Sequence, residues 1–530
     1  MTVLITGAGS GIGRALAIQA DRHGHRLILV GRRAAPLEQT AAGLRDALVL
    51  PADVTTPDGR AAIARAVAGT GLDILINNAG MVPSGAAGTT DDAQIAATLA
   101  LNVAAPMALT RDLLGALPER LYGAWMAEFR NPLIHSFFCN DPALIWLILQ
   151  DRPGDFPKSN RMREGLAPLL GNGVFIANGA DWARQRRIID PAFDGGRLRD
   201  SFPAVLDAAR AASQRLEPGV QDVEPHAAHA AADVIFRTLF SLPVEHRIAA
   251  DVFEAFRDHQ AAQPLVNLAA LLPLPAWMPR PHSHRTRATA ARIRGLIRDL
   301  VRDRARAIAA GTAPDDLATR IMTTPDPDTG TPFSEAEMID QVAVMFLAGH
   351  ETSASVLAWA LWLLAAHPDW QDRVAEEAAT LDDFASVSGL RATRAVFREA
   401  LRLYPAVAMF VREATTAETF RDRHVPRGAQ LVISPWHLHR HNRLWDRPDD
   451  FDPARWDTTE GRASARAAFL PFSAGPRACP GAGLAMIEGV VMLAAITARW
   501  RLQVTDRQPM PVARLTIRAR DGIWVSLTPR

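Results

Sequence analysis

The chain has 530 residues, of which 48% are hydrophobic and 22% are charged, the proportions of an ordinary globular protein. A single hydrophobic core rarely grows to this length, so the length predicts two domains. The formal net charge of +1 gives no electrostatic reason to expect nucleic acid or an anionic membrane as a partner. The chain does not open with a basic region followed by an apolar stretch, and its apolar runs, around 342–364 and 490–496, are interrupted by charge or too short to span a bilayer. We therefore expect a cytoplasmic protein without a membrane span.

The first predicted element is a short buried strand, Val3 to Thr6, which runs through a glycine-rich loop into a helix beginning near Arg14. Backbone N–H groups at such a helix start can approach a pyrophosphate, because glycines there carry no side chains. The loop alone is weak support, since many tight strand-to-helix turns are rich in glycine for steric reasons. The candidate nucleotide-binding residues of the loop are Gly7, Ser10, Gly11, Ile12 and Gly13.

Three further strands are predicted after this helix. The first of them, Arg26 to Val30, leads to a pair of arginines, and arginine at this place favours the 2′-phosphate of NADP over a bare ribose. Together with the glycine loop, the polar residues after the strands resemble the short-chain dehydrogenase/reductase family, and Asn102 matches its helix asparagine. The resemblance implies an α/β partial Rossmann segment, with further NADP-binding candidates at Arg32, Arg33, Asp53 and Asn78.

The segment departs from that family at the residues that do its chemistry. Family members use a Tyr-x-x-x-Lys pair for proton transfer. The two tyrosines of this chain are followed four residues later by Met126 and Ala408, and Lys158 is its only lysine. The segment also ends near Leu117, before half of the family's sheet. We expect residues 1–118 to be a cofactor-binding half that does not reduce carbonyls, with an inert fused fragment as the alternative to a working NADP site.

Residues 119–530 form the second predicted domain. The boundary near Pro118 has no flexible Ser/Gly linker, so we expect the two parts to abut. The domain begins with a short strand, Leu133 to Cys139, and a helix, Asp141 to Gln150, and helical periodicity dominates most of the remaining sequence. A proline-rich apolar stretch, Pro264 to Pro281, separates two helical regions.

A long helix is predicted from Ser334, where Glu337 completes a capping box, to His367, which precedes a proline. It would be roughly 50 Å long at the usual rise per residue. Small residues at 348 and 349 let another group approach the helix, and Glu351 with Thr352 supply a carboxylate and a hydroxyl that can deliver protons. The alternative for Thr352 is a hydrogen bond back to its own helix.

Two residue pairs in the domain are each predicted to share a helix face. Glu399 and Arg402 lie one turn apart and can form an ion pair, which on its own is usually a solvated surface feature. Trp182 and Arg186 are spaced by four residues, so both side chains can reach one ligand.

Ten residues, Phe472 to Gly481, hold a cysteine in a glycine-punctuated loop before a helix. A Cys479 thiolate there can ligate haem iron, and backbone N–H groups at the helix start can hydrogen-bond its sulfur. Arg477 can pair with a haem propionate, and Gly481 lets the next helix lie against a porphyrin. The alternative is a small buried core cysteine. Beside an iron ligand, Cys139 would have no disulfide partner, which fits a reducing compartment.

The spacing Phe-x-x-Gly-x-Arg-x-Cys-x-Gly resembles the haem-binding signature of the cytochrome P450 family. The likeness covers about Leu121 to Arg530 and implies a mainly α (α+β) cytochrome P450 fold. Four other segments follow that family's order: Trp182 to Arg186, Ala348 to Thr352, Glu399 to Arg402 and Phe451 to Trp456.

The resemblance implies a role for each motif. Cys479 would be the axial ligand of the iron of haem b, and Thr352 and Glu351 would be catalytic. The proline-rich stretch would be a lid over the substrate channel, or else a packed connector. The histidines at 437 and 439 could be additional donors to the propionates, but we expect them to lie at the surface. The residues implied to contact haem are Trp182, Arg186, Arg412, Phe472, Arg477 and Gly481, and those implied in a buried structural network are Glu399, Arg402 and Arg455.

The leading functional hypothesis is a haem-thiolate monooxygenase that inserts one atom of dioxygen into an apolar small molecule. Its electrons would come from a separate ferredoxin or flavodoxin with its reductase, because the sequence has no flavin domain and no cysteine-rich iron–sulfur motif. The alternatives are a peroxide-driven haem-thiolate enzyme, a non-catalytic haem or nucleotide sensor, and a bifunctional NADP-dependent oxidoreductase and monooxygenase. The missing Tyr-x-x-x-Lys pair disfavours the last.

Overall fold

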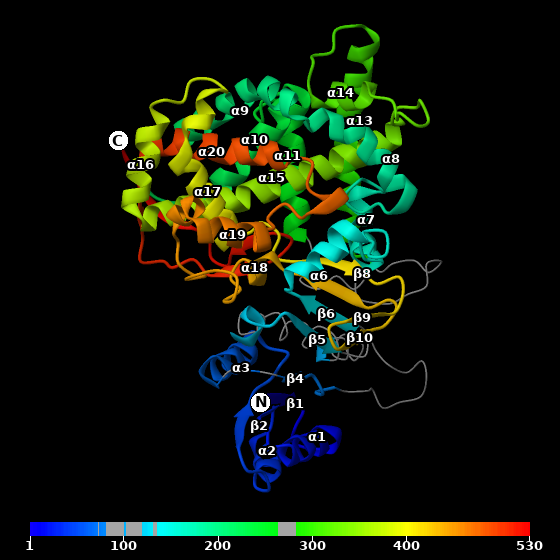
Figure 1. Ribbon diagram of the computed structural model, residues 1–530, viewed down its shortest axis with the longest axis vertical. Helices are drawn as coiled ribbons and strands as arrows, with labels where there is room; N and C mark the ends of the chain where they lie inside the picture. The colour runs from blue at the N-terminus through cyan, green and yellow to red at the C-terminus, as the bar shows by residue number, and fades with distance from the viewer. Residues whose placement is uncertain (71, 73, 81–99, 102–118, 131–134, 263–281) are drawn as a thin grey trace. The chain divides into compact units, whose positions relative to one another are not determined.

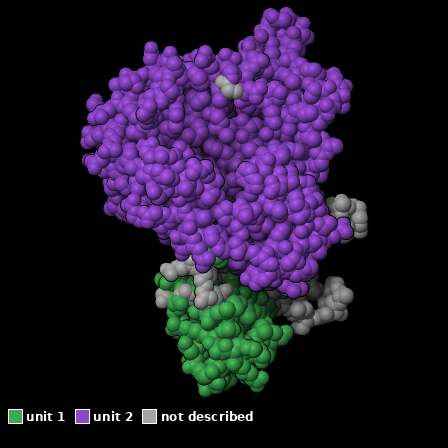
Figure 2. Space-filling model, in the orientation of Figure 1, with its two compact units in different colours: residues 1–124, 264–266 green, residues 125–263, 267–530 purple. Residues whose placement is uncertain are grey.

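A computed structural model describes the chain except for residues 71, 73, 81–99, 102–118, 131–134 and 263–281 (Figure 1). The chain divides into two compact units, coloured separately in Figure 2. Unit 1 comprises residues 1–124, and unit 2 comprises residues 125–263 and 267–530. The predicted lid, the predicted boundary near Pro118 and Asn102 all lie outside the described residues.

Unit 1 is built on a parallel four-stranded sheet in the order β3-β2-β1-β4. Alternate residues of β1 and β2 face opposite sides, and each side has its own buried apolar cluster beneath helices, as in a doubly wound sheet. The strands are β1 (Thr2–Thr6), β2 (Arg26–Gly31), β3 (Ala47–Pro51) and β4 (Ile74–Ile76), and the helical segments are α1 (Gly11–Arg22), α2 (Ala34–Ala41), α3 (Pro57–Thr70) and the short η2 (Glu119–Tyr122). This confirms the predicted Rossmann-like segment, although α1 starts at Gly11 and not near Arg14.

Unit 2 is mainly helical, and Figure 1 shows β5, β6, β8, β9 and β10 together on one side of the helices, near α6. The longer helices are α7 (Asn160–Leu170), α8 (Gly179–Ile189), α9 (Gly195–Arg215), α10 (Val223–Phe240), α11 (Arg247–Ala262), α13 (His284–Ala309), α15 (Glu335–Ala366), α16 (Pro368–Ala378), α17 (Arg391–Leu403), α19 (Thr459–Ala468) and α20 (Ala482–Arg499). The short segments are α6 (Pro142–Trp146), η3 (Leu147–Asp151), η4 (Asp190–Phe193), α14 (Leu317–Thr323), η5 (Ser386–Gly389), α18 (Pro435–Leu438), η6 (Pro453–Asp457) and η7 (Gly475–Arg477).

Two larger sheets and two hairpins complete unit 2. The mixed sheet has the order β5-β6-β11-β8, and a second sheet pairs β12, β15 and β7. The strands are β5 (Met126–Arg130), β6 (His135–Cys139), β7 (Gly219–Asp222), β8 (Phe410–Glu413), β9 (Glu418–Phe420), β10 (Arg423–Val425), β11 (Gln430–Ile433), β12 (Trp500–Val504), β13 (Pro511–Ala513), β14 (Ile517–Ala519) and β15 (Trp524–Pro529). The β9-β10 and β13-β14 pairs are antiparallel hairpins.

The long helix α15 is the central element of unit 2 and packs against α10, α13, α17 and α20. Its N-terminus is the predicted capping box, in which Ser334 and Glu337 each bond the other's backbone N–H. It ends at Ala366, just before His367 and its proline, as predicted. Of the described helices, α15 and α20 are apolar and long enough to cross a bilayer, but 72% and 56% of their apolar windows are buried in the protein, as in core helices.

Candidate functional site

Cys479 lies in the loop between η7 and α20. Its backbone N–H donates to the carbonyl oxygen of Phe472 at 2.9 Å, which closes the loop. Gly475 has φ +71°, and a Cβ there would lie 1.9 Å from the carbonyl oxygen of Leu149, so the turn requires glycine. A Cβ on Gly481 would meet only the Cys479 sulfur, at 3.9 Å. The loop is therefore fixed by its backbone, and the start of α20 directly follows the sulfur.

The two cysteines of the chain lie in opposite environments. Cys139 is buried and its sulfur donates to the Phe137 carbonyl oxygen, while burial raises the pKa of its thiol to about 12. Cys479 is exposed. Desolvation raises the pKa of the Cys479 thiol, and a hydrogen bond from the Gly481 N–H, followed by the charges of Arg186 and Lys158, opposes that rise. The inert core cysteine that the sequence left as an alternative describes Cys139 and not Cys479.

Four cations, Lys158, Arg186, Arg412 and Arg477, form a cluster near this sulfur and repel one another electrostatically. Burial, with the mutual repulsion, lowers the pKa of Arg412 and of Arg477 to about 10. Arg186 has a carboxylate partner, Asp190, at 2.6 Å. Within the described part of the chain, no carboxylate lies at ion-pair distance from the other three cations. We call these four residues the cation cluster.

Two members of the cation cluster, Arg477 and Arg186, also have neutral partners that hold them in place. Arg477 donates to the carbonyl oxygen of Ala177 and to the Asn178 side chain, both at 3.0 Å, and its guanidinium lies 4.2 Å from the centre of the Trp182 ring. Arg186 donates to the Ala478 carbonyl oxygen at 2.7 Å, next to the thiolate candidate. Haem b carries two propionate carboxylates and an iron that accepts a thiolate. The unpaired cations and the accessible sulfur fit that group, and Phe472 borders the same loop.

The middle of α15 carries the predicted catalytic residues. The hydroxyl of Thr352 donates to the Ala348 carbonyl oxygen at 2.5 Å, the hydrogen bond within the helix that the sequence left open. A Cβ on Gly349 would lie 2.3 Å from the Ile235 side chain of α10. Glycine at this position therefore serves helix packing within the protein.

The carboxylate of Glu351 is buried and fully occupied by donors. Arg518 donates to both of its oxygens, at 3.1 and 2.8 Å, Thr516 donates at 2.8 Å, and Gln260 also donates. Burial would raise the pKa of Glu351, but Arg518 outweighs it and holds that pKa below its ordinary value. Sequence reasoning missed Arg518 and Thr516, because nothing in a C-terminal hairpin indicates a partner 167 residues away.

The predicted structural network is assembled as a buried group. Arg402 pairs with Glu399 at 2.8 Å and Arg455 pairs with the same carboxylate at 2.9 Å, and the side chains of both pairs are 0–6% exposed. Arg402 also donates to the carbonyl oxygens of His439 and Asp450, both at 2.9 Å. The network thus ties α17 to the segment that leads toward the cysteine loop.

The histidines at 437 and 439 are buried, so the expectation that they lie at the surface is wrong. Desolvation lowers the pKa of His437 to about 4 and that of His439 to about 3, so both rings are neutral. His439 accepts the Leu470 N–H at 2.8 Å through Nε2, and Ser434 bonds His437 at 2.8 Å. His439 thus holds backbone groups and His437 bonds a side chain, contacts that a sequence pattern does not reveal.

The glycine loop of unit 1 is tightly packed against the end of β4. A Cβ on Gly13 would lie 2.2 Å from the Gly7 carbonyl oxygen, and Gly7 itself has φ +68°. The Asn78 amide donates to the carbonyl oxygens of Thr6 and Gly7. These glycines are therefore explained sterically, the alternative that the sequence left open.

The other nucleotide-binding candidates of unit 1 differ in their hydrogen bonds to the protein and in their exposure to solvent. Asp53 accepts the N–H and the hydroxyl of Thr55 in a local turn, and these bonds lower its pKa. Five candidates remain exposed at the surface: Ser10, Gly11, Ile12, Arg32 and Arg33. Gly11 has φ +51° and open space where a Cβ would stand.

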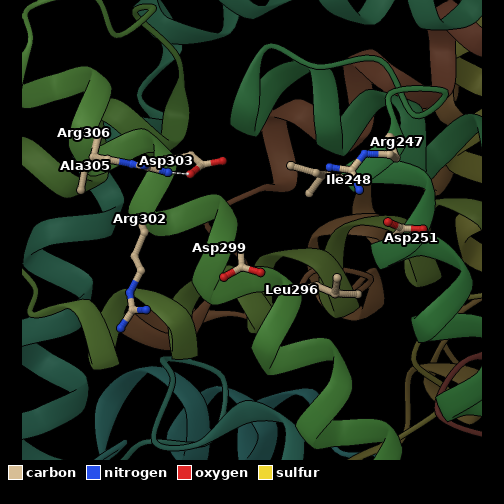
Figure 3. A pocket seen from close by; sticks show the side chains of 9 residues that line it. All are labelled: Arg247, Ile248, Asp251, Leu296, Asp299, Arg302, Asp303, Ala305 and Arg306. Carbon is tan, nitrogen blue, oxygen red and sulfur yellow. Dashed lines mark hydrogen bonds and ion pairs between the residues drawn. The ribbon is translucent and has the colours of Figure 1, made fainter.

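A surface groove of about 730 Å³ between α11 and α13 lies apart from all of these residues (Figure 3). It has three arginines and three aspartates, and Arg306 is paired with Asp303, so its charges largely cancel. None of the candidate site residues lines it. Its lining residues are Arg247, Ile248, Asp251, Leu296, Asp299, Arg302, Asp303, Ala305 and Arg306.

Comparison with known proteins agrees with this geometry. The family model described as cytochrome P450 matches residues 121–520, and the one described as short chain dehydrogenase matches residues 1–124. The chain is 34% identical to the cyclooctat-9-en-7-ol 5-monooxygenase of Streptomyces melanosporofaciens, over 71% of this chain and 82% of that protein. It is 30% identical to the pentalenene oxygenase of Streptomyces avermitilis, over 74% and 87%. The fold resembles the solved haem domain of cytochrome P450DA, with a TM-score of 0.67 over 80% and 92% of the two chains and 23% identity.

Proposed function

The chain belongs to the cytochrome P450 family and is a monooxygenase of that family, and we propose that it inserts one atom of dioxygen into an apolar, ring-containing small molecule. Haem, when bound, supplies the binding and activation of dioxygen. The observation that carries the proposal is the accessible Cys479 sulfur at the start of α20, close to the cation cluster. Such a site attracts a dianionic group by charge and holds its metal through sulfur.

The residues of this site have separate roles in stabilising the thiolate and in holding protons. The Gly481 N–H and the charges of Arg186 and Lys158 stabilise the Cys479 thiolate. Thr352 keeps a hydroxyl proton at the Ala348 carbonyl oxygen, and rotation about χ1 would present that proton elsewhere. Glu351 is ionised, so it accepts a proton only after its hydrogen bonds to Arg518 loosen.

The proposed substrate class rests on the relatives. The two bacterial relatives are named for cyclooctat-9-en-7-ol and pentalenene, both of which are unsaturated ring compounds by name. At 34% and 30% identity, two enzymes of one family share a class of substrate more often than the same substrate molecule. We therefore propose ring-containing, largely apolar compounds as the first to screen.

The proposed electron source is a separate ferredoxin or flavodoxin with its reductase. A nicotinamide delivers a hydride, whereas haem iron takes single electrons, so a converting flavin or iron–sulfur group is needed. The chain has only two cysteines, and Cys139 is buried, so it offers no iron–sulfur ligand set of its own. A cytoplasmic location, where such partners and unpaired cysteines are found, is part of the proposal.

For unit 1 we propose at most weak binding of NADP and no carbonyl reduction. Exposed Arg32 and Arg33 support the binding of a 2′-phosphate, whereas Asn78 and Asp53 already bond the protein itself. Met126 stands where a Tyr122-based pair would need its lysine. A bifunctional enzyme is therefore the weaker candidate.

The deciding experiment is reconstitution of the full chain with haem and with a surrogate ferredoxin and its reductase. We expect oxygen consumption coupled to a hydroxylated product from a panel of ring compounds. Product formation with peroxide alone, and none with the reductase pair, would contradict the proposed electron source. Consumption of oxygen without product from every compound would contradict the substrate class.

A further inference from the structure

Strand β14 and the residues beside it bond both the middle of α15 and the start of α10. Glu351 of α15 accepts hydrogen bonds from Thr516 and Arg518. The backbone N–H of Ala519 donates to the Glu224 carboxyl group of α10 at 3.1 Å. The guanidinium of Arg518 is close to both acids, since its Nη2 is 2.8 Å from Glu351 and its Nη1 is 4.0 Å from Glu224. One guanidinium therefore serves two acids that are distant in the sequence.

Glu224 and Glu351 receive unequal shares of this cation. Both side chains are largely buried, at 14% and 7% exposed, and within the described residues no other arginine or lysine lies at ion-pair distance from either. Burial raises the pKa of Glu224, and the Ala519 N–H and Arg518 offset that rise only in part. Burial also acts to raise the pKa of Glu351, but Arg518 outweighs it and holds that pKa below its ordinary value. Glu224 thus keeps a proton in a range of pH in which Glu351 is ionised.

The other titratable and polar neighbours do not reverse this difference. Asp222 adds a like charge beside Glu224, which also raises the pKa of Glu224. His350 lies 3.9 Å from the Glu351 carboxylate, and burial lowers the pKa of its ring, which favours the neutral form. Gln260 of α11 donates to Glu351 and carries no charge. The proton and the position of Arg518 therefore decide which of the two acids is ionised.

A movement of Arg518 would exchange the states of the two acids. When Glu224 gives up its proton, its new charge attracts the guanidinium, and Glu351 loses the hydrogen bonds that hold its pKa down. Glu351 then takes up the proton and can pass it on. Glu224, the more exposed of the two, regains a proton from solvent, and the guanidinium returns to Glu351. After this cycle both acids are in their first state, and one proton has moved inward.

We propose that Glu224 is the outer acid of a proton path that leads to Glu351, and that Arg518 is the positioning residue that moves between them. The proposal rests on the role proposed above for Glu351 in accepting and passing on protons. It adds a residue that no sequence motif indicated, because Glu224 and Arg518 both lie far from Glu351 in the sequence.

The first test observes the acids directly, by infrared difference spectra of the resting haem-loaded chain at a series of pH values. Glu224 should give the carbonyl band of a protonated carboxyl group, and Glu224→Gln should lack this band. In Glu351→Gln the band should titrate at a lower pH, because a like charge is removed and Arg518 is free to bind Glu224. Glu254→Gln, which changes an exposed acid of α11, is the control and should leave the band unchanged. No Glu224 band, or an equal midpoint in the parent and Glu351→Gln, would contradict the proposal.

The second test measures product formation against pH with the surrogate ferredoxin and its reductase. In the parent the rate should fall as the pH rises through the pKa of Glu224, because the outer proton donor is then ionised. Glu224→Gln should form product about tenfold more slowly and without this pH dependence, and its solvent deuterium isotope effect should be larger. Glu224→Asp keeps an acid and should retain most of the rate, and Glu254→Gln should retain all of it.

The same measurements separate this proposal from the role proposed for Glu351. If Glu351→Gln slows product formation and Glu224→Gln does not, the path through Glu224 is wrong and the role of Glu351 stands. If neither variant slows it, both proposals are wrong. Rates are expressed per protein that gives the reduced carbon monoxide band of the parent, so a loss of haem does not imitate a loss of proton supply.

Discussion

At the scale of single residues, the environments of the two cysteines assign them different chemistry. Cys479 is accessible and has cations nearby, and its sulfur is next to the first N–H groups of α20. Cys139 is enclosed in β6 and keeps its proton at any ordinary pH. The same side chain is therefore a ligand at one position and a small apolar group at the other.

Replacing Cys479 by serine should keep the fold and abolish thiolate ligation, because a hydroxyl is a poor, harder ligand for haem iron. The measurement is the Soret band of the reduced carbon monoxide complex, with Cys139→Ser as the matched control. The control should retain the band of the parent. An unchanged band in Cys479→Ser would show that iron is ligated elsewhere.

Thr352→Ala should bind haem normally but release more of its electrons as hydrogen peroxide, because a hydroxyl proton is no longer held at the Ala348 carbonyl oxygen. Thr352→Ser keeps the hydroxyl and should restore most of the coupling. The ratio of product to electrons consumed measures the effect. Equal ratios in parent and Thr352→Ala would assign the hydroxyl to the helix alone.

At the scale of elements, buried charges decide which helices are joined. Glu399 is paired with arginines from its own helix and from η6, and Glu488 of α20 accepts a hydrogen bond from Ser353 of α15 at 2.8 Å. The first carboxylate is paired with two guanidinium groups, and the second is kept neutral by burial, which raises the pKa of Glu488 to about 8. Each contact fixes elements that are distant in sequence.

Arg402→Ala should destabilise the protein by about 3–5 kcal/mol, because it leaves the Glu399 charge buried with one partner fewer. Arg394→Ala, on the same helix but exposed, is the control and should change stability little. Urea unfolding and the fraction of protein that retains haem report the difference. A normally stable, fully loaded Arg402→Ala protein would show that the network carries little energy.

The Glu488 carboxyl predicts a dependence of stability on pH. Its folded-state pKa of about 8 lies above the ordinary 4.5, so the folded protein binds this proton more tightly than the unfolded chain does. The stability that the Glu488 proton contributes is fully present below about pH 4.5 and is lost as the pH rises through about 8. Unfolding free energy should fall by about 2–3 kcal/mol between about pH 6 and about pH 8.5, at 1.36 kcal/mol per pKa unit, and Glu488→Gln should lack this difference. Equal slopes in the two proteins would contradict it.

Sequence predicted the elements well where a local signal exists. The capping box at Ser334, the glycine loop and the loop around Cys479 each contain their own structural reason within ten residues. Contacts between residues that are far apart in the sequence gave no local signal. Arg518 bonds Glu351 from another element of the fold. The two histidines that we predicted to be at the surface are buried by tertiary packing, which no local pattern encodes.

At the scale of the whole molecule, a unit that matches the short chain dehydrogenase family and a cytochrome P450 unit share one chain. The sheet of unit 1 places exposed arginines after β2, where a 2′-phosphate would lie, but the family's proton-transfer pair is missing. The two units therefore differ: unit 1 lacks its family's proton-transfer pair, whereas unit 2 carries each of the cytochrome P450 motifs that the sequence predicted.

The purified chain should reduce no ketone with NADPH or NADH and should bind NADP weakly at most, because the proton donor is missing. Titration calorimetry gives the affinity for NADP of the parent and of a double variant, Arg32→Ala with Arg33→Ala. The difference is the contribution of the two arginines to NADP binding, and because both side chains are exposed, the variant leaves packed residues undisturbed. Any preference for NADP over NAD should disappear in the variant. Ketone reduction by the parent that is abolished by Gly13→Asp would restore a bifunctional enzyme.

The hydrogen bonds from Arg518 to Glu351 also determine the order in which parts of unit 2 can fold during synthesis. The ribosome makes α15 first and adds Arg518 only 167 residues later. Until then the Glu351 carboxylate has neither Arg518 nor Thr516 as a donor, and burying it would be costly. A nascent chain stalled before the β13-β14 hairpin should therefore expose this part of α15 to chaperones, and Glu351 is put in place only when that hairpin folds.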